Sequence, residues 1–158
     1  MTLKVAVLIN TPPTNKEFWT DIRTSYFKAL GAVVPTADVH CYDPVFEGEF
    51  PNPAKYDLIT LSGGKVDALS SEPWVLGVPD FMRNTVREYP WTKILGICWG
   101  HRAFCRALGG EIRPVPGGPI AAIQYIPLME AVRKFFFFAS QKGSYIFMFY
   151  LNMTCLGS

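Results

Sequence analysis

The segment Lys93-Ile-Leu-Gly-Ile-Cys-Trp-Gly-His101 decides the fold, because it places a cysteine between a strand and a helix. The apolar run Lys93–Ile97 is typical of a strand buried on both faces of a parallel sheet. Residues Gly100–Leu108 are predicted to form a helix that ends at Gly109-Gly110. The pattern Gly96-x-Cys98-x-Gly100 at this junction is a nucleophile elbow with cysteine in the serine position.

Each residue type in the elbow (residues 96–100) suits nucleophilic chemistry. A nucleophile on so sharp a turn has a strained backbone, and glycines on either side let the strand and helix approach closely. The following helix directs its N-terminal N–H groups at the sulfur of Cys98, which favours the thiolate. The N–H of Trp99 can supply half of an oxyanion hole, and Ser62-Gly63-Gly64, after another predicted strand, can supply the other half.

The rest of the chain alternates strands and helices. Its 158 residues suit one domain. Repeated strand–helix–strand order predicts an α/β fold with a mostly parallel sheet. The predicted strands are Lys4–Ile9, Val39–Tyr42, Tyr56–Leu61, Glu111–Val115 and Ile120–Leu128. One helix is predicted over Phe18–Leu30 with Gly31 ending it, and a second is predicted to carry Pro79 in its first turn.

Composition excludes several classes of protein. A net charge of +2 is too small for a nucleic-acid binder. Four cysteines without a C-x-x-C pair, and only two histidines, argue against a metal site. No apolar run reaches the length of a membrane span, and the opening apolar run is too short for a signal peptide. We therefore expect a cytoplasmic protein, not bound to membranes, with four reduced thiols.

The elbow and its surroundings resemble a known family. Ile94–His101, followed by Ala107-Leu-Gly-Gly110, is similar to class I glutamine amidotransferase domains, and Ser62-Gly63-Gly64 after Asp57–Leu61 resembles that family's oxyanion strand. The resemblance covers about residues 3–130 and is nearer to the stand-alone fungal type. It implies a three-layer α/β/α sandwich of the flavodoxin-like class I amidotransferase fold, with the C-terminal part incomplete.

The resemblance also implies a reaction and the residues for it. Cys98 would attack the side-chain amide of glutamine or another γ-glutamyl amide, which gives a γ-glutamyl thioester and ammonia, and water would then release glutamate. Gly64 and Trp99 would form the oxyanion hole. Gly63, Gly96, Gly100, His101 and Arg102 would shape the substrate pocket. No metal or organic cofactor is implied, and the binding partner is a small-molecule substrate.

The chain departs from the family in its base and in one pocket residue. The family's catalytic His-x-Glu is absent, and the only histidines are His40 and His101. His101 matches the family's elbow histidine, which is not the base. Arg102 stands where the family commonly has a glutamine that helps to hold substrate. An arginine there either favours a carboxylate ligand, blocks the pocket, or is a solvated helix residue.

The tail is the third departure, since the resemblance stops near residue 134. We therefore predict an amidotransferase-like domain over 1–134 and an atypical hydrophobic tail over 135–158, which has neither proline nor acid. Whether the chain is an enzyme is left open by the incomplete triad. The alternatives are a non-catalytic pseudoenzyme, a truncated or mis-spliced product without activity of its own, and a Cys-elbow protein of the DJ-1/PfpI type. A partner chain is not identified by the sequence.

Overall fold

The computed structural model describes residues 2–12, 16–114, 120–123, 148–151 and 153–156. The chain divides into two compact units. The first consists of Met1–Arg113 with Met153–Ser158, and the second of Pro114–Asn152. The candidate site lies in the first unit.

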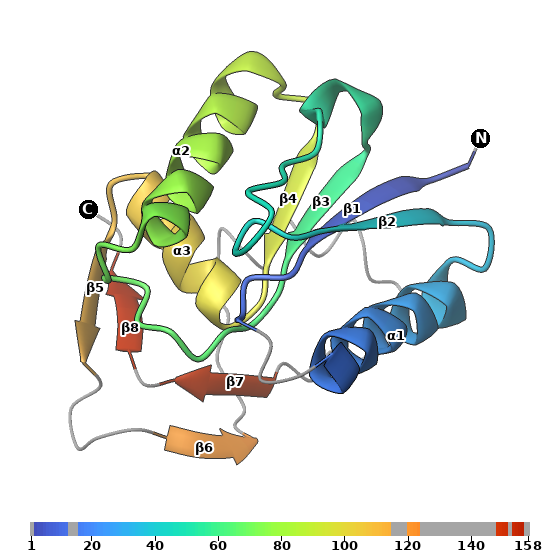
Figure 1. Cartoon of the computed structure of the whole chain (residues 1–158). Coiled ribbons are helices and arrows are strands. Elements are labelled where there is room, and N and C mark those ends of the chain that lie inside the picture. Colours follow the sequence, from blue (N-terminus) through green and yellow to red (C-terminus); the bar gives the residue numbers. More distant parts are fainter. Residues whose placement is uncertain (1, 13–15, 115–119, 124–147, 152, 157–158) are drawn as a thin grey trace, which may run out of the picture. The chain divides into compact units, whose positions relative to one another are not determined.

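A four-stranded parallel sheet forms the centre of the first unit (Figure 1). Its strand order is β2-β1-β3-β4. After β1 the chain adds β2 on one side of it. It then crosses to the other side of β1, where it adds β3 and β4. Open α/β sheets bind ligands where the order reverses in this way, outside the carboxyl ends of the strands. The strands are β1 (Lys4–Leu8), β2 (Asp38–Tyr42), β3 (Leu58–Leu61) and β4 (Lys93–Gly96).

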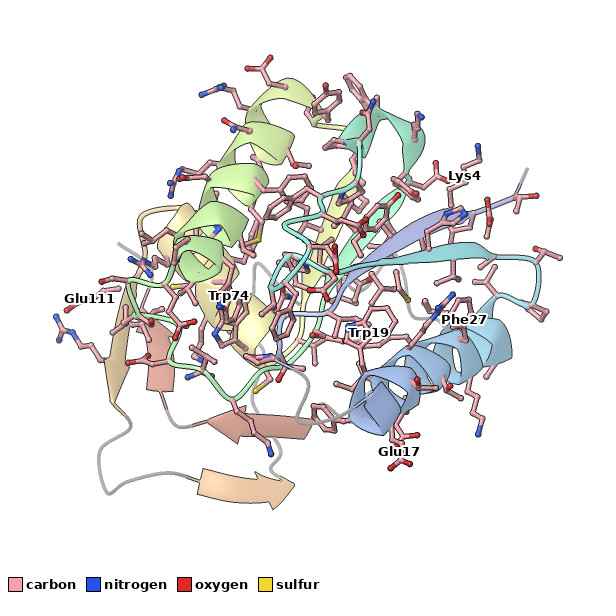
Figure 2. The ribbon with its side chains drawn as sticks, viewed as in Figure 1. Lys4, Glu17, Trp19, Phe27, Trp74 and Glu111 are labelled. Carbon is pink, nitrogen blue, oxygen red and sulfur yellow. The ribbon has the colours of Figure 1, made fainter. Side chains whose placement is uncertain are left out.

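Helices cover both faces of this sheet, which confirms the predicted three-layer fold (Figure 1). On one face, α1 (Lys16–Val33) packs against Val5, Val7 and Ile9 of the first strand region, and Trp19 is among the helix residues that make this contact (Figure 2). On the other face lie α2 (Pro73–Glu88) and α3 (Trp99–Ala107). The indole rings of Trp74 and Trp99 join these two helices with 5.1 Å between centroids. A short 3-10 helix, η1 (Pro53–Lys55), precedes β3.

Two predicted helix boundaries are wrong. Helix α1 continues through Gly31 to Val33, because an exposed glycine inside a helix costs only about 1 kcal/mol. Helix α2 begins at Pro73 rather than near Pro79, which lies inside it. The stripe Trp74, Val75, Val78 and Met82 is buried, so packing of this face outweighs the hydrogen bond that an internal proline removes.

Short strands complete the described part of the chain. β5 (Glu111–Pro114) and β8 (Met153–Leu156) form one two-stranded sheet. In the second unit, β6 (Ile120–Ile123) pairs antiparallel with β7 (Met148–Leu151). Residues 124–128 of the predicted strand and most of the tail over 135–158 lie outside the described residues, so the boundary at residue 134 stays a prediction. No helix in the described part has the length and apolar character needed to span a membrane.

The expectation that all four cysteines carry reduced thiols is wrong. Cys105 is buried beside α2 and is disulfide-bonded, whereas Cys41 and Cys98 carry thiols. Sequence spacing could not reveal this, because disulfide pairing depends on which residues the fold brings together.

Candidate active site

Cys98 has the backbone conformation of an elbow nucleophile. Its φ of 53° and ψ of −104° make it the one non-glycine residue with positive φ among the described residues. It is the N-cap of α3, and its carbonyl oxygen accepts a hydrogen bond from the N–H of Arg102 at 3.2 Å. Such a conformation costs on the order of 1–3 kcal/mol and is kept only where the surrounding structure enforces it.

Two glycines make the sharp turn sterically feasible. A Cβ atom on Gly96 would lie 2.6 Å from the backbone of Gly100 and of His101. A Cβ atom on Gly100 would lie 2.5 Å from Cβ and 2.7 Å from the carbonyl oxygen of Leu61. Real Cβ atoms do not approach so closely, and therefore no other residue type fits at either position without a shift of the backbone.

The loop after β3, residues 62–64, lies directly against the elbow. A Cβ on Gly63 would be 3.6 Å from Cβ and 4.0 Å from Sγ of Cys98. A Cβ on Gly64 would collide with the carbonyl oxygen of Asn10 and would lie 3.3 Å from Cγ of Trp99. Within the described residues, neither the N–H of Gly64 nor that of Trp99 donates a hydrogen bond. Neither N–H is therefore committed to another described residue.

The sequence predicts Ser62 only as part of the Ser62-Gly63-Gly64 motif, without a role for its side chain. It is 2% exposed, and its hydroxyl accepts a hydrogen bond from the N–H of Asn10 at 2.8 Å and donates one to the carbonyl oxygen of Gly63 at 2.8 Å. In the sequence, only the place of Ser62 at the end of a predicted strand indicated that its side chain would lie at the site.

His101 and Arg102 lie on the first turn of α3, next to the elbow. Burial lowers the pKa of His101 below its ordinary value, and the nearby charge of Arg102 lowers it further. The Arg102 side chain is partly buried, and no described residue accepts a hydrogen bond from its buried Nε. The main-chain N–H of Arg102 donates to the carbonyl oxygen of Cys98 at 3.2 Å, so the two residues lie one helical turn apart.

The fold does not bring His40 to the elbow. Its Nδ1 lies 3.2 Å from the hydroxyl of Tyr56, and its Nε2 lies 3.5 Å from the carboxylate of Asp38. Three strand spacings separate β2 from β4, which is about 14 Å across the sheet. In register, His40 aligns through Ala6 and Ile59 with Ile94, and Cys98 is four residues further on, about 13 Å along the strand direction.

The described residues contain no group of three or more His, Cys, Asp or Glu side chains that could hold a metal ion. A thiol on a strained turn at the start of a helix, as at Cys98, is suited to nucleophilic attack.

Comparisons with known proteins show what the chain is similar to. Over 143 residues, the chain is 54% identical to the glutamine amidotransferase-like protein chyE of Penicillium rubens. The aligned residues cover 90% of this chain and 60% of that protein. This similarity confirms the resemblance of the chain to glutamine amidotransferase-like proteins. It is also 32% identical over 93 residues to gamma-glutamyl peptidase 2 of Arabidopsis thaliana, covering 57% of this chain and 37% of that protein.

A solved structure supports the fold of this amidotransferase-like chain. A glutamine amidotransferase from Thermotoga maritima matches with a TM-score of 0.64 and 16% identity, over 98% of this chain and 63% of that one. At that identity the likeness shows the fold alone. No protein-family model matches the chain. The chain spans about three fifths of the Penicillium relative's length, so the activity of the whole relative does not transfer to it automatically.

Proposed function

We propose that this amidotransferase-like chain binds glutamine or a γ-glutamyl amide, and that Cys98 attacks the side-chain amide. The observation that carries the proposal is the strained backbone of Cys98, with Gly63 of the loop after β3 packed against its side chain. The names of the relatives, amidotransferase-like and γ-glutamyl peptidase, support the same substrate class over the DJ-1/PfpI alternative.

The proposed reaction balances with water as its only co-reactant. The Sγ of Cys98 bonds to the amide carbon, and the oxyanion that forms accepts hydrogen bonds from Gly64 and Trp99. The carbon–nitrogen bond then breaks, and the nitrogen leaves as ammonia with the proton of the thiol. Water cleaves the thioester, which releases glutamate and regenerates the thiol. We propose the cytoplasm as the place of action, because Cys98 must stay reduced to act as a nucleophile; the disulfide at Cys105 is an exception to the reduced state of cysteines usual in that compartment.

Turnover by this chain alone is expected to be slow. The sequence has two histidines, of which His40 lies far from Cys98 and His101 has a lowered pKa. Loss of one triad member typically reduces kcat by several orders of magnitude, about 10⁴-fold. The same observation favours a second candidate function, in which the domain binds its ligand without turning it over.

The test is the formation of glutamate and ammonia from L-glutamine by the purified chain. Cys98→Ala is expected to abolish formation. The matched control is Cys41→Ala, which removes the thiol of β2 and is expected to retain it. Formation at the same rate in the Cys98 variant would overturn the proposal. Saturable glutamine binding by a folded chain that releases no ammonia would establish the non-catalytic function instead, and absence of both would favour a product without activity of its own.

Arg102 gives a sharper test of the ligand. The change Arg102→Gln removes a partly buried guanidinium whose Nε has no acceptor among the described residues. We propose that this cation favours a carboxylate ligand, so that glutamate binds the wild-type chain about tenfold more tightly than the variant. If the variant binds glutamate equally well or better, Arg102 blocks the pocket or is a solvated helix residue.

A further inference from the structure

The main-chain and hydroxyl hydrogen bonds of Ser62 together connect the ends of three segments that build the site. The N–H of Ser62 donates to the carbonyl oxygen of Leu8 in β1 at 3.0 Å, and its carbonyl oxygen accepts from the N–H of Gly100 at 3.2 Å. Its hydroxyl accepts from the N–H of Asn10 and donates to the oxygen of Gly63, both at 2.8 Å. All polar groups of Ser62 are therefore engaged inside the protein.

The direction of the hydroxyl hydrogen follows from chemistry. A serine hydroxyl has one hydrogen to donate and two lone pairs. Because the N–H of Asn10 can only donate, it occupies a lone pair of Ser62 and leaves the hydroxyl hydrogen for another acceptor. The acceptor within reach is the carbonyl oxygen of Gly63. Asn10 thus sets Ser62 as the donor to Gly63.

This bond fixes one peptide plane. The carbonyl of Gly63 and the N–H of Gly64 belong to the same peptide unit, and in a trans peptide they point in opposite directions. When the oxygen of Gly63 is held toward the buried hydroxyl, the N–H of Gly64 must point away from it. Glycine on both sides of this plane would otherwise let it rotate at little cost.

We propose that Ser62 is a positioning residue that holds the N–H of Gly64 in the orientation required of an oxyanion donor. The inference rests on the proposed function for its consequence in catalysis, whereas its structural content is independent of turnover. The donor is then in place before substrate arrives, which is the condition under which an oxyanion hole is effective. Ser62 itself does not touch the reacting atoms.

The kinetic test compares Ser62→Ala, Ser62→Thr and Thr60→Val. The last is a matched control two residues earlier, in β3, since the Thr60 hydroxyl is buried but has no hydrogen-bond partner among the described residues. In glutamine hydrolysis, Ser62→Ala is expected to lower kcat about 10²-fold with little change in KM, as for loss of one oxyanion donor. The threonine variant is expected to recover most of kcat, and Thr60→Val to leave it unchanged. A change in KM alone, or equal losses in Ser62→Ala and Thr60→Val, would overturn the proposal.

A second readout needs no activity. The chain contains three Gly-Gly pairs, at 63–64, 109–110 and 117–118. Glycine labelled with ¹³C at the carbonyl and ¹⁵N at the amide therefore gives three cross-peaks in an experiment that links a carbonyl to the following N–H. Gly110→Ala and Gly118→Ala each remove one peak, which assigns the peak of the 63–64 pair.

The labelled chain separates failure of this inference from failure of the proposed function. The Gly63 carbonyl and Gly64 amide shifts are expected to move in Ser62→Ala and to stay in place in Ser62→Thr and Thr60→Val. If they stay in place in Ser62→Ala, Ser62 does not hold the peptide plane, even if the chain is an active hydrolase. If they move but the wild-type chain releases no ammonia, the positioning role holds and the catalytic proposal fails.

Discussion

The N–H of Gly100 donates a hydrogen bond to the carbonyl oxygen of Ser62 at 3.2 Å, and this contact joins the start of α3 to the loop after β3. The approach is possible because Gly100 has no side chain. A Cβ at this position would lie within 2.7 Å of the carbonyl oxygen of Leu61 and 2.5 Å of its Cβ. Backbone and a buried side chain cannot give way cheaply, so the elbow and the loop depend on each other.

Gly100→Ala is therefore expected to destabilise the fold. Overpacking of a buried site typically costs about 1–3 kcal/mol, and here the clash is with the core side of β3, so we expect at least about 2 kcal/mol. Urea unfolding followed by circular dichroism measures the change in the free energy of unfolding. Gly31→Ala in α1 is the matched control, because no atom lies within 4 Å of its Cβ position. That variant is expected to gain about 0.5–1 kcal/mol. Equal effects of the two changes would contradict the steric argument.

Local sequence was sufficient to predict the strand–cysteine–helix turn. Gly96 and Gly100 flank Cys98 within five residues, and the turn they allow is a short-range property. The parallel direction of β1, β3 and β4 also followed from the alternation of strands and helices, whereas their order in the sheet did not. The role of Ser62 did not follow, because its partners Asn10 and Gly100 are 52 and 38 positions away along the chain. The residues next to Ser62 in the sequence do not indicate which distant segments the fold places beside it.

The errors in the helix boundaries have a similar origin. Gly31 and Pro79 are strong local signals for the end and the start of a helix. The structure places both inside helices, because burial of the apolar stripe of α2 and packing of α1 on the sheet outweigh the local cost. Tertiary packing decides such conflicts, and it is not visible in a local window of sequence.

The stability of the fold should fall in mild acid because of His101. Burial, and then the charge of Arg102, lower its pKa below 6.5, so the unfolded chain binds this proton more readily than the folded chain does. Its contribution to stability is therefore complete above about pH 6.5 and is lost as pH falls below that value. Between about pH 7.5 and about pH 5.5, the wild-type chain is expected to lose more stability than His101→Gln.

The pKa of His101 can be measured without resonance assignment. In His40→Gln, the imidazole of His101 is the only one in the chain, and its proton resonance can be titrated directly. A midpoint above 6.5 would contradict a pKa lowered by burial and by Arg102.

Tyr26 should make the fold sensitive to strong alkali. Its pKa is raised to about 12, chiefly by burial and to a lesser extent by Cys41 and Cys98. A raised pKa means that the contribution is present below the unfolded value of 10.0 and is lost as pH rises through about 12. Tyr26→Phe should remove on the order of 2 kcal/mol of this alkaline loss. Absorbance at the tyrosinate band reports the titration, and Tyr89→Phe is the control for loss of one phenol. Ionisation of the Tyr26 hydroxyl near pH 10 would exclude the effect.

The side chain of Asn10 is expected to be replaceable, although its main-chain N–H is not. Asn10 is 0% exposed, and neither its amide nitrogen nor its amide oxygen has a hydrogen-bond partner in the described part of the protein. An unsatisfied buried amide costs about 1–3 kcal/mol, and an apolar side chain of similar shape avoids that cost. Asn10→Leu keeps the main-chain N–H that donates to Ser62. We therefore expect an unchanged or higher free energy of unfolding, by up to about 1 kcal/mol.

Thr92→Val provides the opposite case in the same assay. The Thr92 hydroxyl is also buried, but it lies 3.0 Å from the carbonyl oxygen of Pro53 and 3.2 Å from that of Tyr56. Its removal should cost about 1 kcal/mol or more, because a satisfied bond is lost and two buried acceptors lose a donor. If Asn10→Leu costs as much as Thr92→Val, the amide of Asn10 is satisfied in solution, and an internal water behind Gly64 becomes part of the support of the oxyanion loop.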